Sequence, residues 1–369
     1  MTIIAAYTVE GCPILIGDLL ISGIERIDRK HSVPMIGGVE NIFPAGSGWS
    51  IIGLRQKIEI LNATTAIAWA GSYIAARIVI KELKLLASEN KLSFSKIKDY
   101  FSSLDPDIVK QGVSFIGWTL EKDLFKTFEF NTKNRLSTSL IGTVVATGTG
   151  AEAFVKSLSN IPLNSFKATG KINSLATAIS TSLFTTGLML RAEASAASSS
   201  SLLGFFGGGY ELATFFDGRF QKIGNVTYVF WEARISNLGV TISSPLLALK
   251  QEYFNEILLI HSIEFGNHST QERQITRNDY HAVLPVYAAA SEIDLQLLKP
   301  TSLNSRFTCH YFGISINGNY EILCKLDHRI DDATRDILFI EENGQVTVKV
   351  AQDFLTHIAE EITKKAQKS

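Results

Sequence analysis

A threonine stands directly behind the initiator methionine of this chain, at the head of the stretch Thr2-Ile3-Ile4-Ala5-Ala6-Tyr7-Thr8-Val9. A small second residue normally permits removal of Met1, which would leave Thr2 with a free α-amine beside its hydroxyl. Such an amine has a reference pKa of about 7.7–8.0, so part of it is neutral at pH 7 and can accept the hydroxyl proton during nucleophilic attack. Many ordinary edge strands also begin with threonine, so Thr2 alone leaves a structural role open.

The elements that would position further polar groups follow in order. Apolar runs bounded by turn residues predict strands over Thr2–Val9, Pro13–Ile21, Lys57–Asn62 and Thr65–Ala70. Asp18 lies in the second of these strands, and the fourth closes at Gly71. Ser72 is a candidate N-cap for the helix that begins there. The pattern therefore predicts an acid on a buried strand and a glycine N–H at a helix N-terminus.

The stretch Lys57-Ile58-Glu59-Ile60-Leu61-Asn62, followed by Ala66-Ile67-Ala68-Trp69-Ala70-Gly71-Ser72, resembles the central motif of proteasome β-type subunits and bacterial HslV peptidases, which are N-terminal nucleophile hydrolases. In that family a threonine opens the mature chain and an acid ends the second strand. A lysine precedes the third strand, and an Ala-Gly-Ser-like turn begins the first helix. The matching positions here are Thr2, Asp18, Lys57 and Gly71, and the resemblance covers about residues 2–235.

The resemblance implies a catalytic role for each of these four residues. The hydroxyl of Thr2 would attack a carbonyl, with its own amine as the base. Lys57 would favour the alkoxide-like form of that hydroxyl, and Asp18 would hold and balance the lysine charge. The backbone N–H of Gly71 would stabilise the oxyanion. The implied activity is that of a threonine peptidase or amidase acting through an acyl-enzyme.

Three departures from the family pattern leave a second interpretation open. The segment between Asp18 and Lys57 is longer than in typical members, and Ala151 stands where a serine usually follows the Gly-x-Gly turn. The later Asp-Ser-x-x-Gly-Gly element, which supports the threonine amine, is replaced by Leu203-Gly204-Phe205-Phe206-Gly207-Gly208. An apolar replacement removes hydrogen bonds that orient the amine. The alternative is therefore a catalytically inactive assembly or binding protein on the same fold.

The expected order of strands and helices predicts an α+β protein in layers. Strands, two helices, strands, two helices and strands follow one another through about residue 235, which indicates layers, with two sheets between helices as one solution. The family resemblance implies that solution, a four-layer αββα sandwich. The strand over Val226–Ala233 is expected to continue the sheet of the hairpin at Asp217-Gly218. We expect a first domain over 1–235 and, over 236–369, a mainly β extension that ends in a helix and packs on it.

Composition excludes several other classes of function. The 369 residues are 46% hydrophobic and 19% charged with a net charge of −1, which gives no basic excess for nucleic acid. Cys12, Cys309 and Cys324 are too few for a disulfide framework and suit the cytoplasm, and no signal peptide opens the chain. Residues 172–190 carry no charge, but their many polar residues favour a buried helix over a membrane span.

Competing motifs are weaker on these residues. The turn Gly148-Thr149-Gly150 resembles a dinucleotide fingerprint, but no acid follows between Glu152 and Glu193. A two-residue turn at Asn317-Gly318 places Cys309 and Cys324 diagonally on one face and His310 on the other, which suits neither a metal nor a disulfide. Lys30 could compete with Lys57, although a solvated loop is favoured.

No metal or organic cofactor is indicated by these patterns. The resemblance implies a peptide or protein substrate, a homo-oligomeric assembly that encloses the active sites, and an ATP-driven unfoldase as a partner. The sequence itself shows none of these partners.

Overall fold

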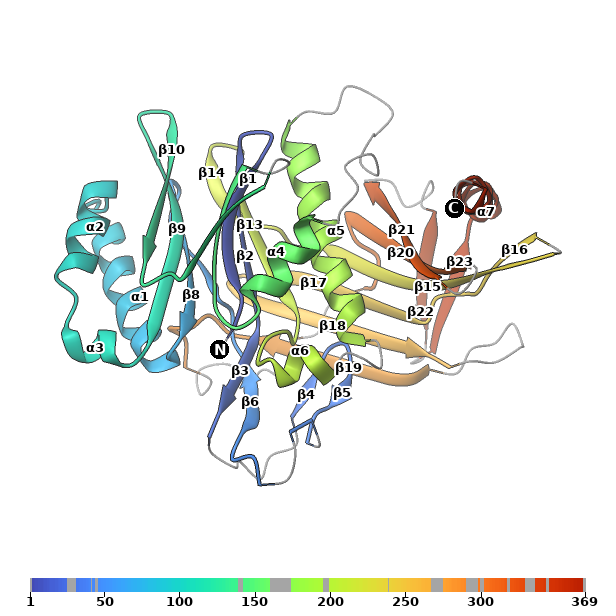
Figure 1. Cartoon of the computed structure of the whole chain (residues 1–369), viewed down its shortest axis with the longest axis horizontal. Coiled ribbons are helices and arrows are strands. Elements are labelled where there is room, and N and C mark those ends of the chain that lie inside the picture. Colours follow the sequence, from blue (N-terminus) through green and yellow to red (C-terminus); the bar gives the residue numbers. More distant parts are fainter. Residues whose placement is uncertain are drawn as a thin grey trace. The chain divides into compact units, whose positions relative to one another are not determined.

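The computed structural model describes residues 2–24, 31–40, 42–43, 46–138, 142–159, 174–194, 199–237, 239–266, 275–289, 298, 302–316, 319–328, 336–342 and 345–367. The chain divides into two compact units (Figure 1). The first comprises Met1–Ile223 and Val283–Ile293, and the second comprises Gly224–Ala282 and Asp294–Ser369. Both combine helices with largely antiparallel sheets, so the chain is a mixed α and β protein.

Two antiparallel sheets form the centre of the first unit. The six-stranded sheet has the order β11-β12-β1-β2-β13-β14, with bounds Asn134–Thr138, Gly142–Thr147, Ile4–Val9, Cys12–Asp18, Tyr210–Phe216 and Arg219–Lys222. The four-stranded sheet has the order β10-β9-β8-β7, with bounds Leu124–Phe130, Val113–Glu121, Thr65–Gly71 and Ile58–Asn62. The strands expected over Thr2–Val9, Lys57–Asn62 and Thr65–Ala70 are therefore confirmed, with small changes at their ends.

Alternating residues of β8 separate two hydrophobic cores. Ala66 and Ala68 belong to a cluster that also contains Ile4 and Leu15 of the six-stranded sheet, so the two sheets pack face to face. Ile67 and Trp69 point the opposite way, because successive side chains of a strand lie on opposite faces. They belong to a second cluster, formed with helix residues, on the outer face of the four-stranded sheet.

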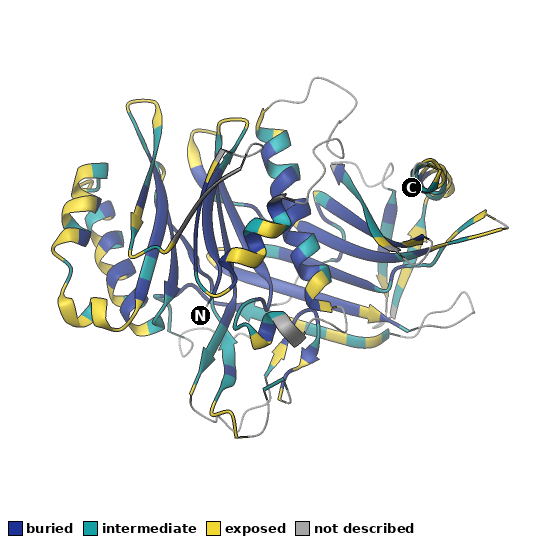
Figure 2. Ribbon diagram, viewed as in Figure 1, coloured by how far each residue is buried: buried dark blue, intermediate teal, exposed yellow. Residues whose placement is uncertain are grey.

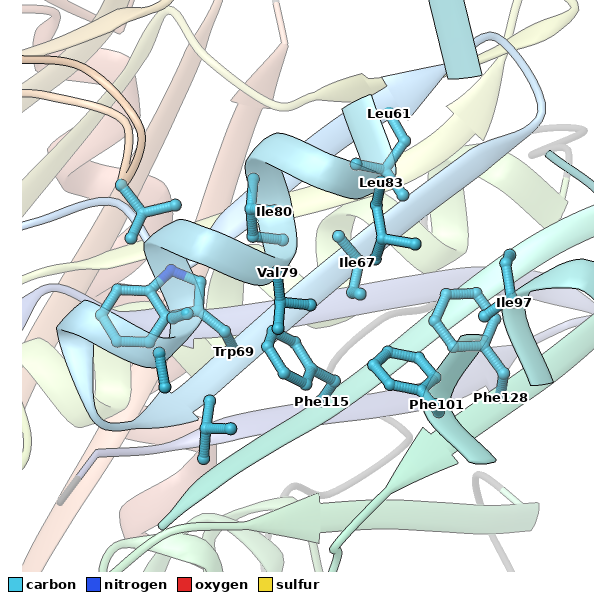
Figure 3. Close-up of a cluster of buried hydrophobic side chains, with 14 of the residues drawn as sticks. Leu61, Ile67, Trp69, Val79, Ile80, Leu83, Ile97, Phe101, Phe115 and Phe128 are labelled. Atoms are coloured by element: carbon cyan, nitrogen blue, oxygen red, sulfur yellow. The ribbon is translucent and has the colours of Figure 1, made fainter. Parts of the chain in front are cut away.

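Helices cover that outer face. The helices are α1 (Tyr73–Ser88), α2 (Phe94–Ser102) and α3 (Pro106–Lys110). Ser72 caps α1 as expected, accepting a hydrogen bond from the Ala75 N–H at 3.3 Å, and Ser93 caps α2. Figure 3 shows Val79 and Leu83 of α1 and Phe101 of α2 among the buried side chains of this core.

A polar helix packs on the other face of the six-stranded sheet. Helix α5 (Ser174–Ala194) contacts β1, β2 and β13, beside the shorter α4 (Ala151–Ser159). Its buried hydroxyls have partners: Thr185 donates to the Thr181 carbonyl at 2.9 Å, and Ser182 accepts from the Tyr7 hydroxyl at 3.1 Å. This agrees with the buried helix expected from the uncharged run, whose residues 172–173 lie outside the described residues. No helix among the described residues is long and apolar enough to cross a membrane.

The long segment between β2 and β7 contains short strands that the sequence did not predict. They are β3 (Leu20–Gly23), β4 (Ser32–Val33), β5 (Gly37–Gly38) and β6 (Ser50–Leu54), and β3 pairs with β6 while β4 pairs with β5. The strand expected over Pro13–Ile21 is broken at Leu19, whose N–H turns to the Gly207 and Gly209 carbonyls at 3.2 and 3.1 Å. Leu20, Val33 and Ile51 form a small core with Leu202 of α6 (Ser199–Leu203).

The second unit is built on a seven-stranded sheet. Its strands are β15 (Val226–Ser236), β16 (Gly239–Ile242), β17 (Leu247–Phe254), β18 (Ile257–Phe265), β19 (Ile275–Val283), β20 (Phe307–Ile316) and β21 (Asn319–His328). The ribbon β22 (Ile337–Glu342) and β23 (Gln345–Val350) leads to helix α7 (Gln352–Ala366). Phe354, Ile358 and Ile362 of α7 are buried against this sheet, so the apolar face of the C-terminal helix belongs to the core. Figure 2 shows the central strands of the large sheets as buried and most outer helix faces as exposed.

The interpretation of Val226–Ala233 as a continuation of the first sheet is wrong. Strand β15 pairs with β17 and, in parallel, with β20, whereas the six-stranded sheet ends at β14. The chain leaves the first sheet where the Ile223 N–H bonds to the Leu212 carbonyl at 2.8 Å. The division at Ile223–Gly224 therefore lies before β15, while the expected boundary at 235/236 falls near the end of that strand.

Candidate active site

The first hairpin brings Thr2 beside Asp18. Strands β1 and β2 pair with Ile4 opposite Gly17, and the Asp18 N–H donates to the Ile3 carbonyl at 3.0 Å. The Thr2 hydroxyl then donates to Asp18 Oδ1, which also accepts from the Ile3 N–H at 3.2 Å. Both side chains are fully buried. The register of one hairpin thus sets the candidate nucleophile against the candidate acid.

The Asp18 carboxylate receives a further donor from a distant part of the chain. The Gly207 N–H donates to Asp18 Oδ2 at 3.0 Å. Burial raises the pKa of Asp18 above its usual value, while Lys57 and the hydrogen bonds from Thr2, Gly207 and Ile3 oppose that rise. Asp18 is therefore a desolvated carboxyl whose two oxygens are held by protein donors.

Lys57 is a buried lysine immediately before β7. Its side chain is 1% exposed, and its ammonium lies 4.1 Å from the centroid of the Trp69 ring. A Cβ on Gly17 would lie 2.8 Å from the Lys57 Cβ, so the glycine leaves room for the lysine stem beside β2. Burial lowers the pKa of Lys57 to about 8, and the charges of Asp18 and Glu211 resist this. The amine can therefore change its protonation state close to neutral pH.

Gly71 ends β8 in a conformation that favours glycine. Its φ is +92°, and a Cβ there would lie 1.9 Å from the Gly112 carbonyl oxygen. The next residue, Ser72, donates its N–H to that same oxygen at 3.2 Å and caps α1. Gly71 therefore contacts Gly112 and Val113. Thr2, Asp18 and Lys57, in contrast, lie in one buried group.

A second buried polar group adjoins Lys57. Glu211 accepts from the Ile58 N–H and lies 3.7 Å from the Lys222 ammonium, which in turn donates to Gln56 Oε1. Burial raises the pKa of Glu211 to about 7, and Lys222 opposes that rise. Sequence reasoning missed this group, because Lys222 and Glu211 approach the edge strand β7 only through the pairing of β13 with β14.

A segment from much later in the chain runs alongside the start of β7. The Gln56 N–H donates to the Leu284 carbonyl at 3.1 Å, and the Gln56 side-chain amide donates to the Val283 carbonyl at 2.6 Å. The Val286 N–H donates to Glu59 at 3.2 Å. Residues 279–291 carried no assignment from the sequence, and no local pattern indicates this long-range contact.

Glu193 and Tyr210 are further buried polar residues near Asp18. Glu193 lies near the end of α5, is fully buried, and accepts the Gly208 N–H at 3.1 and 3.0 Å on its two oxygens. Burial raises its pKa to about 8, and the Asp18 charge adds to that rise. Burial raises the pKa of Tyr210 well above its usual value, and Glu193 and Asp18 add to it. The one available signal was that Glu193 is the first acid after Glu152.

The glycines of the Gly148-Thr149-Gly150 turn pack against the first residues of the chain. A Cβ on Gly148 would lie 1.9 Å from the Thr2 carbonyl oxygen, and one on Gly150 would lie 2.2 Å from the Ile3 side chain. The Gly150 N–H also donates to the Thr2 carbonyl at 3.3 Å. These contacts give the turn a role in seating Thr2, which explains its glycines without a bound phosphate.

The remaining sequence candidates lie apart from this group. Cys309 pairs with Leu326 and Tyr311 with Cys324, as the turn at 317–318 predicted, although those two turn residues lie outside the described residues. All three cysteines are free thiols, and no cluster of three or more His, Cys, Asp or Glu suited to a metal occurs among the described residues. Lys30 lies outside the described residues.

Comparisons with known proteins find similarity among solved structures but none among family models or curated sequences. No protein-family model and no curated protein matches this sequence. Among solved structures, eukaryotic HslV from Trypanosoma brucei is similar to 57% of this chain over 98% of its own length, with 13% identity and a TM-score of 0.32.

Proposed function

We propose that this chain is an N-terminal threonine hydrolase that cleaves peptide or amide bonds through an ester on Thr2. The observation that carries the proposal is the buried convergence of the Thr2 hydroxyl, the Asp18 carboxylate and the Lys57 amine. A hydroxyl is a weak nucleophile at its ordinary pKa, and these neighbours are of the kind that activate one. The proposal requires removal of Met1, which frees the amine that acts as base.

The reaction would proceed in two steps. The Thr2 oxygen attacks the carbonyl carbon, its proton passes to the α-amine, and the tetrahedral intermediate collapses as the leaving amine takes that proton. Water then attacks the ester, again losing a proton to the amine, and releases the acid and free Thr2. Lys57 and Asp18 would set the electrostatics around the hydroxyl. The Gly71 N–H would bind the oxyanion, a contact whose loss typically costs on the order of a hundredfold in rate.

Packing within the first unit supports the four-layer part of the proposal. Helix α1 packs on the four-stranded sheet, that sheet packs on the six-stranded sheet, and α5 packs on the far face of the latter. We assign the chemistry to this αββα arrangement within residues 1–235. Residues 236–369 would form a C-terminal extension, which would provide a partner surface if the protein is a non-catalytic assembly or binding protein.

Assembly and location complete the proposal. We expect a homo-oligomer that encloses the sites, an ATP-driven unfoldase as partner, and a cytoplasmic place of action. The three free thiols support a reducing compartment. These expectations are tested by the mass of the assembly in solution and by its interaction with an unfoldase.

A specific observation favours a second candidate, a non-catalytic assembly or binding protein. The Thr2 side chain is 0% exposed, and Leu203 and Gly204 stand where the family pattern has the polar side chains that support the amine. Hydrolysis of a library of peptide and acyl-amide reporters separates the two candidates. The first predicts turnover by the wild type and by Thr2→Ser, and none by Thr2→Ala. No turnover by any of them, with assembly unchanged, favours the second.

A further inference from the structure

Glu193 is a buried acid that the proposed reaction does not use. It belongs to α5, a helix that carries no other Asp or Glu, and its side chain is fully buried. Its two carboxyl oxygens lie 3.1 and 3.0 Å from the Gly208 nitrogen, so it accepts a shared hydrogen bond from that N–H. A buried carboxyl is costly, because the charged form loses its hydration, so its retention here calls for a role.

A continuous path of contacts leads from Glu193 to Thr2. Glu193 holds the Gly208 N–H, and the neighbouring Gly207 N–H donates to Asp18 Oδ2 at 3.0 Å. The other oxygen of Asp18 accepts from the Thr2 hydroxyl and from the Ile3 N–H. Two successive peptide groups therefore connect two buried carboxyls, and the second of these carboxyls faces the candidate nucleophile.

Close contacts hold Gly207 and Gly208 against β3 and Glu193. Gly207 and Gly208 have φ values of +119° and +71°, which side chains rarely adopt. A Cβ on Gly207 would lie 2.4 Å from Glu193 Oε2, so the acid packs directly against the glycine backbone. The Gly207 carbonyl accepts from the Leu20 N–H at 3.0 Å. A shift of the acid would thus be passed on to the donor that Asp18 receives.

We propose that Glu193 is a positioning residue of the Thr2 site, which acts through the Gly207–Gly208 backbone to orient the Asp18 carboxylate toward the Thr2 hydroxyl. Its contribution to the reaction rests on the proposed function, whereas its effect on the position of Asp18 does not. The Ile3 N–H reports on that position without any substrate, because it donates to the same Asp18 oxygen as Thr2.

The charge state of Glu193 makes the orientation of the Asp18 carboxylate depend on pH. With its pKa at about 8, the carboxyl is mostly neutral at pH 7 and faces Asp18 and Tyr210. Above that pH its negative charge lies near that of Asp18, so the carboxylate pair is driven apart. Lys57 faces Asp18 and titrates in the same range, so a step near pH 8 must be assigned with a variant.

The test is a pH titration of backbone amide NMR shifts in the full chain, with ¹⁵N-labelled glycine and isoleucine. In the wild type we expect Gly208, Gly207 and Ile3 to share a step near pH 8. Glu193→Gln keeps an acceptor for Gly208 but cannot ionise, so the shared step should disappear. Glu193→Met keeps the length of the side chain without an acceptor, and we expect the protection of the Ile3 and Gly208 amides against exchange to fall at least tenfold. Glu152→Met, an exposed change on α4, should alter neither.

The labelling of Thr2 by a hydroxyl-directed electrophile adds the catalytic readout. We expect Glu193→Met to lower the labelling rate at least tenfold and Glu193→Gln to restore it at pH 7. The positioning role would be overturned if Glu193→Met loses exchange protection at the Gly208 amide while the Ile3 amide is unchanged. It would also be overturned if the wild-type pH titration shows a step at Gly208 that Ile3 does not share. The wild-type titration decides this even if Glu193→Met fails to fold. An unlabelled wild type whose Ile3 and Gly208 still titrate together would overturn the proposed function and support the positioning role.

Discussion

The hydroxyl of Thr2 donates to the buried carboxylate of Asp18, across the first hairpin of the chain. The pairing of Ile4 with Gly17 fixes this relationship, because it sets Ile3, the neighbour of Thr2, against Asp18 at the end of β2. Gly150 holds the Thr2 carbonyl from the other side. The candidate nucleophile is therefore placed by strand register and by close glycine packing rather than by a flexible terminus.

Removal of the Thr2 hydroxyl should abolish activity while the protein still folds. We expect Thr2→Ala to abolish turnover and electrophile labelling. It should also lower the free energy of unfolding by about 1–3 kcal/mol, because buried Asp18 loses a donor. Thr2→Ser is the matched control and should keep both the hydrogen bond and measurable labelling. Denaturant unfolding and labelling assays check these expectations, and full labelling of Thr2→Ala would show that the electrophile reacts elsewhere.

We expect a side chain at Gly71 to destabilise the protein through a close contact as well as through backbone strain, and the two effects can be separated. Gly71→Ala places a Cβ 1.9 Å from the Gly112 oxygen at a φ of +92°. Gly218→Ala meets a similar φ of +74° but nothing within 4 Å. We expect the Gly218 change to cost about 1 kcal/mol of unfolding free energy from backbone strain alone, and the Gly71 change to cost more. Equal costs in thermal unfolding would contradict the close contact.

Lys57 should make stability depend on alkaline pH. Its folded pKa of about 8 lies below the ordinary lysine value of 10.5, so the unfolded chain binds more protons between these values. Stability contributed by this group therefore rises as pH increases from about 8 towards 10.5. We expect the wild type to gain unfolding free energy over Lys57→Met in this window, as measured by urea unfolding at a series of pH values. An unchanged difference between the two proteins would show that Lys57 is not desolvated.

The packing of α5 on the first sheet can be tested at one hydroxyl pair. Ser182→Ala removes the acceptor of the buried Tyr7 hydroxyl, which lies 3.1 Å away, so we expect a loss of about 1–3 kcal/mol in unfolding free energy. Ser180→Ala on the same helix removes only a bond to the Ala176 carbonyl, and should change stability by less than about 0.5 kcal/mol. A similar effect of both changes would argue against the Tyr7 contact.

Local patterns predicted most elements that carry the site. Apolar runs and turn residues predicted β1, β7 and β8, and Ser72 marked the start of α1. The proximity of Thr2 to Asp18 depends on one short hairpin, which a single stretch of sequence can specify. The approach of Lys57 to this pair joins strands of two different sheets, and it was expected only from the family resemblance. The catalytic roles of these residues remain a prediction.

The features of the fold and of the site that were not predicted depend on tertiary contacts, which no local sequence pattern encodes. Glu193 approaches Asp18 only because the end of α5 packs beside the Gly207–Gly208 segment. Strand β15 was assigned to the wrong sheet, because a strand's apolar pattern does not specify its partner. The contact of Leu284 with Gln56 joins residues more than 200 positions apart. Each of these features requires knowledge of how separate elements pack.

The most direct test of the central claim is intact mass measurement with N-terminal peptide mapping, after treatment with a threonine-directed covalent electrophile. The account predicts that Met1 is absent and that a single adduct maps to Thr2. Retention of Met1, or a free Thr2 that stays unlabelled while Asp18 and Lys57 are intact, would contradict the proposed hydrolase.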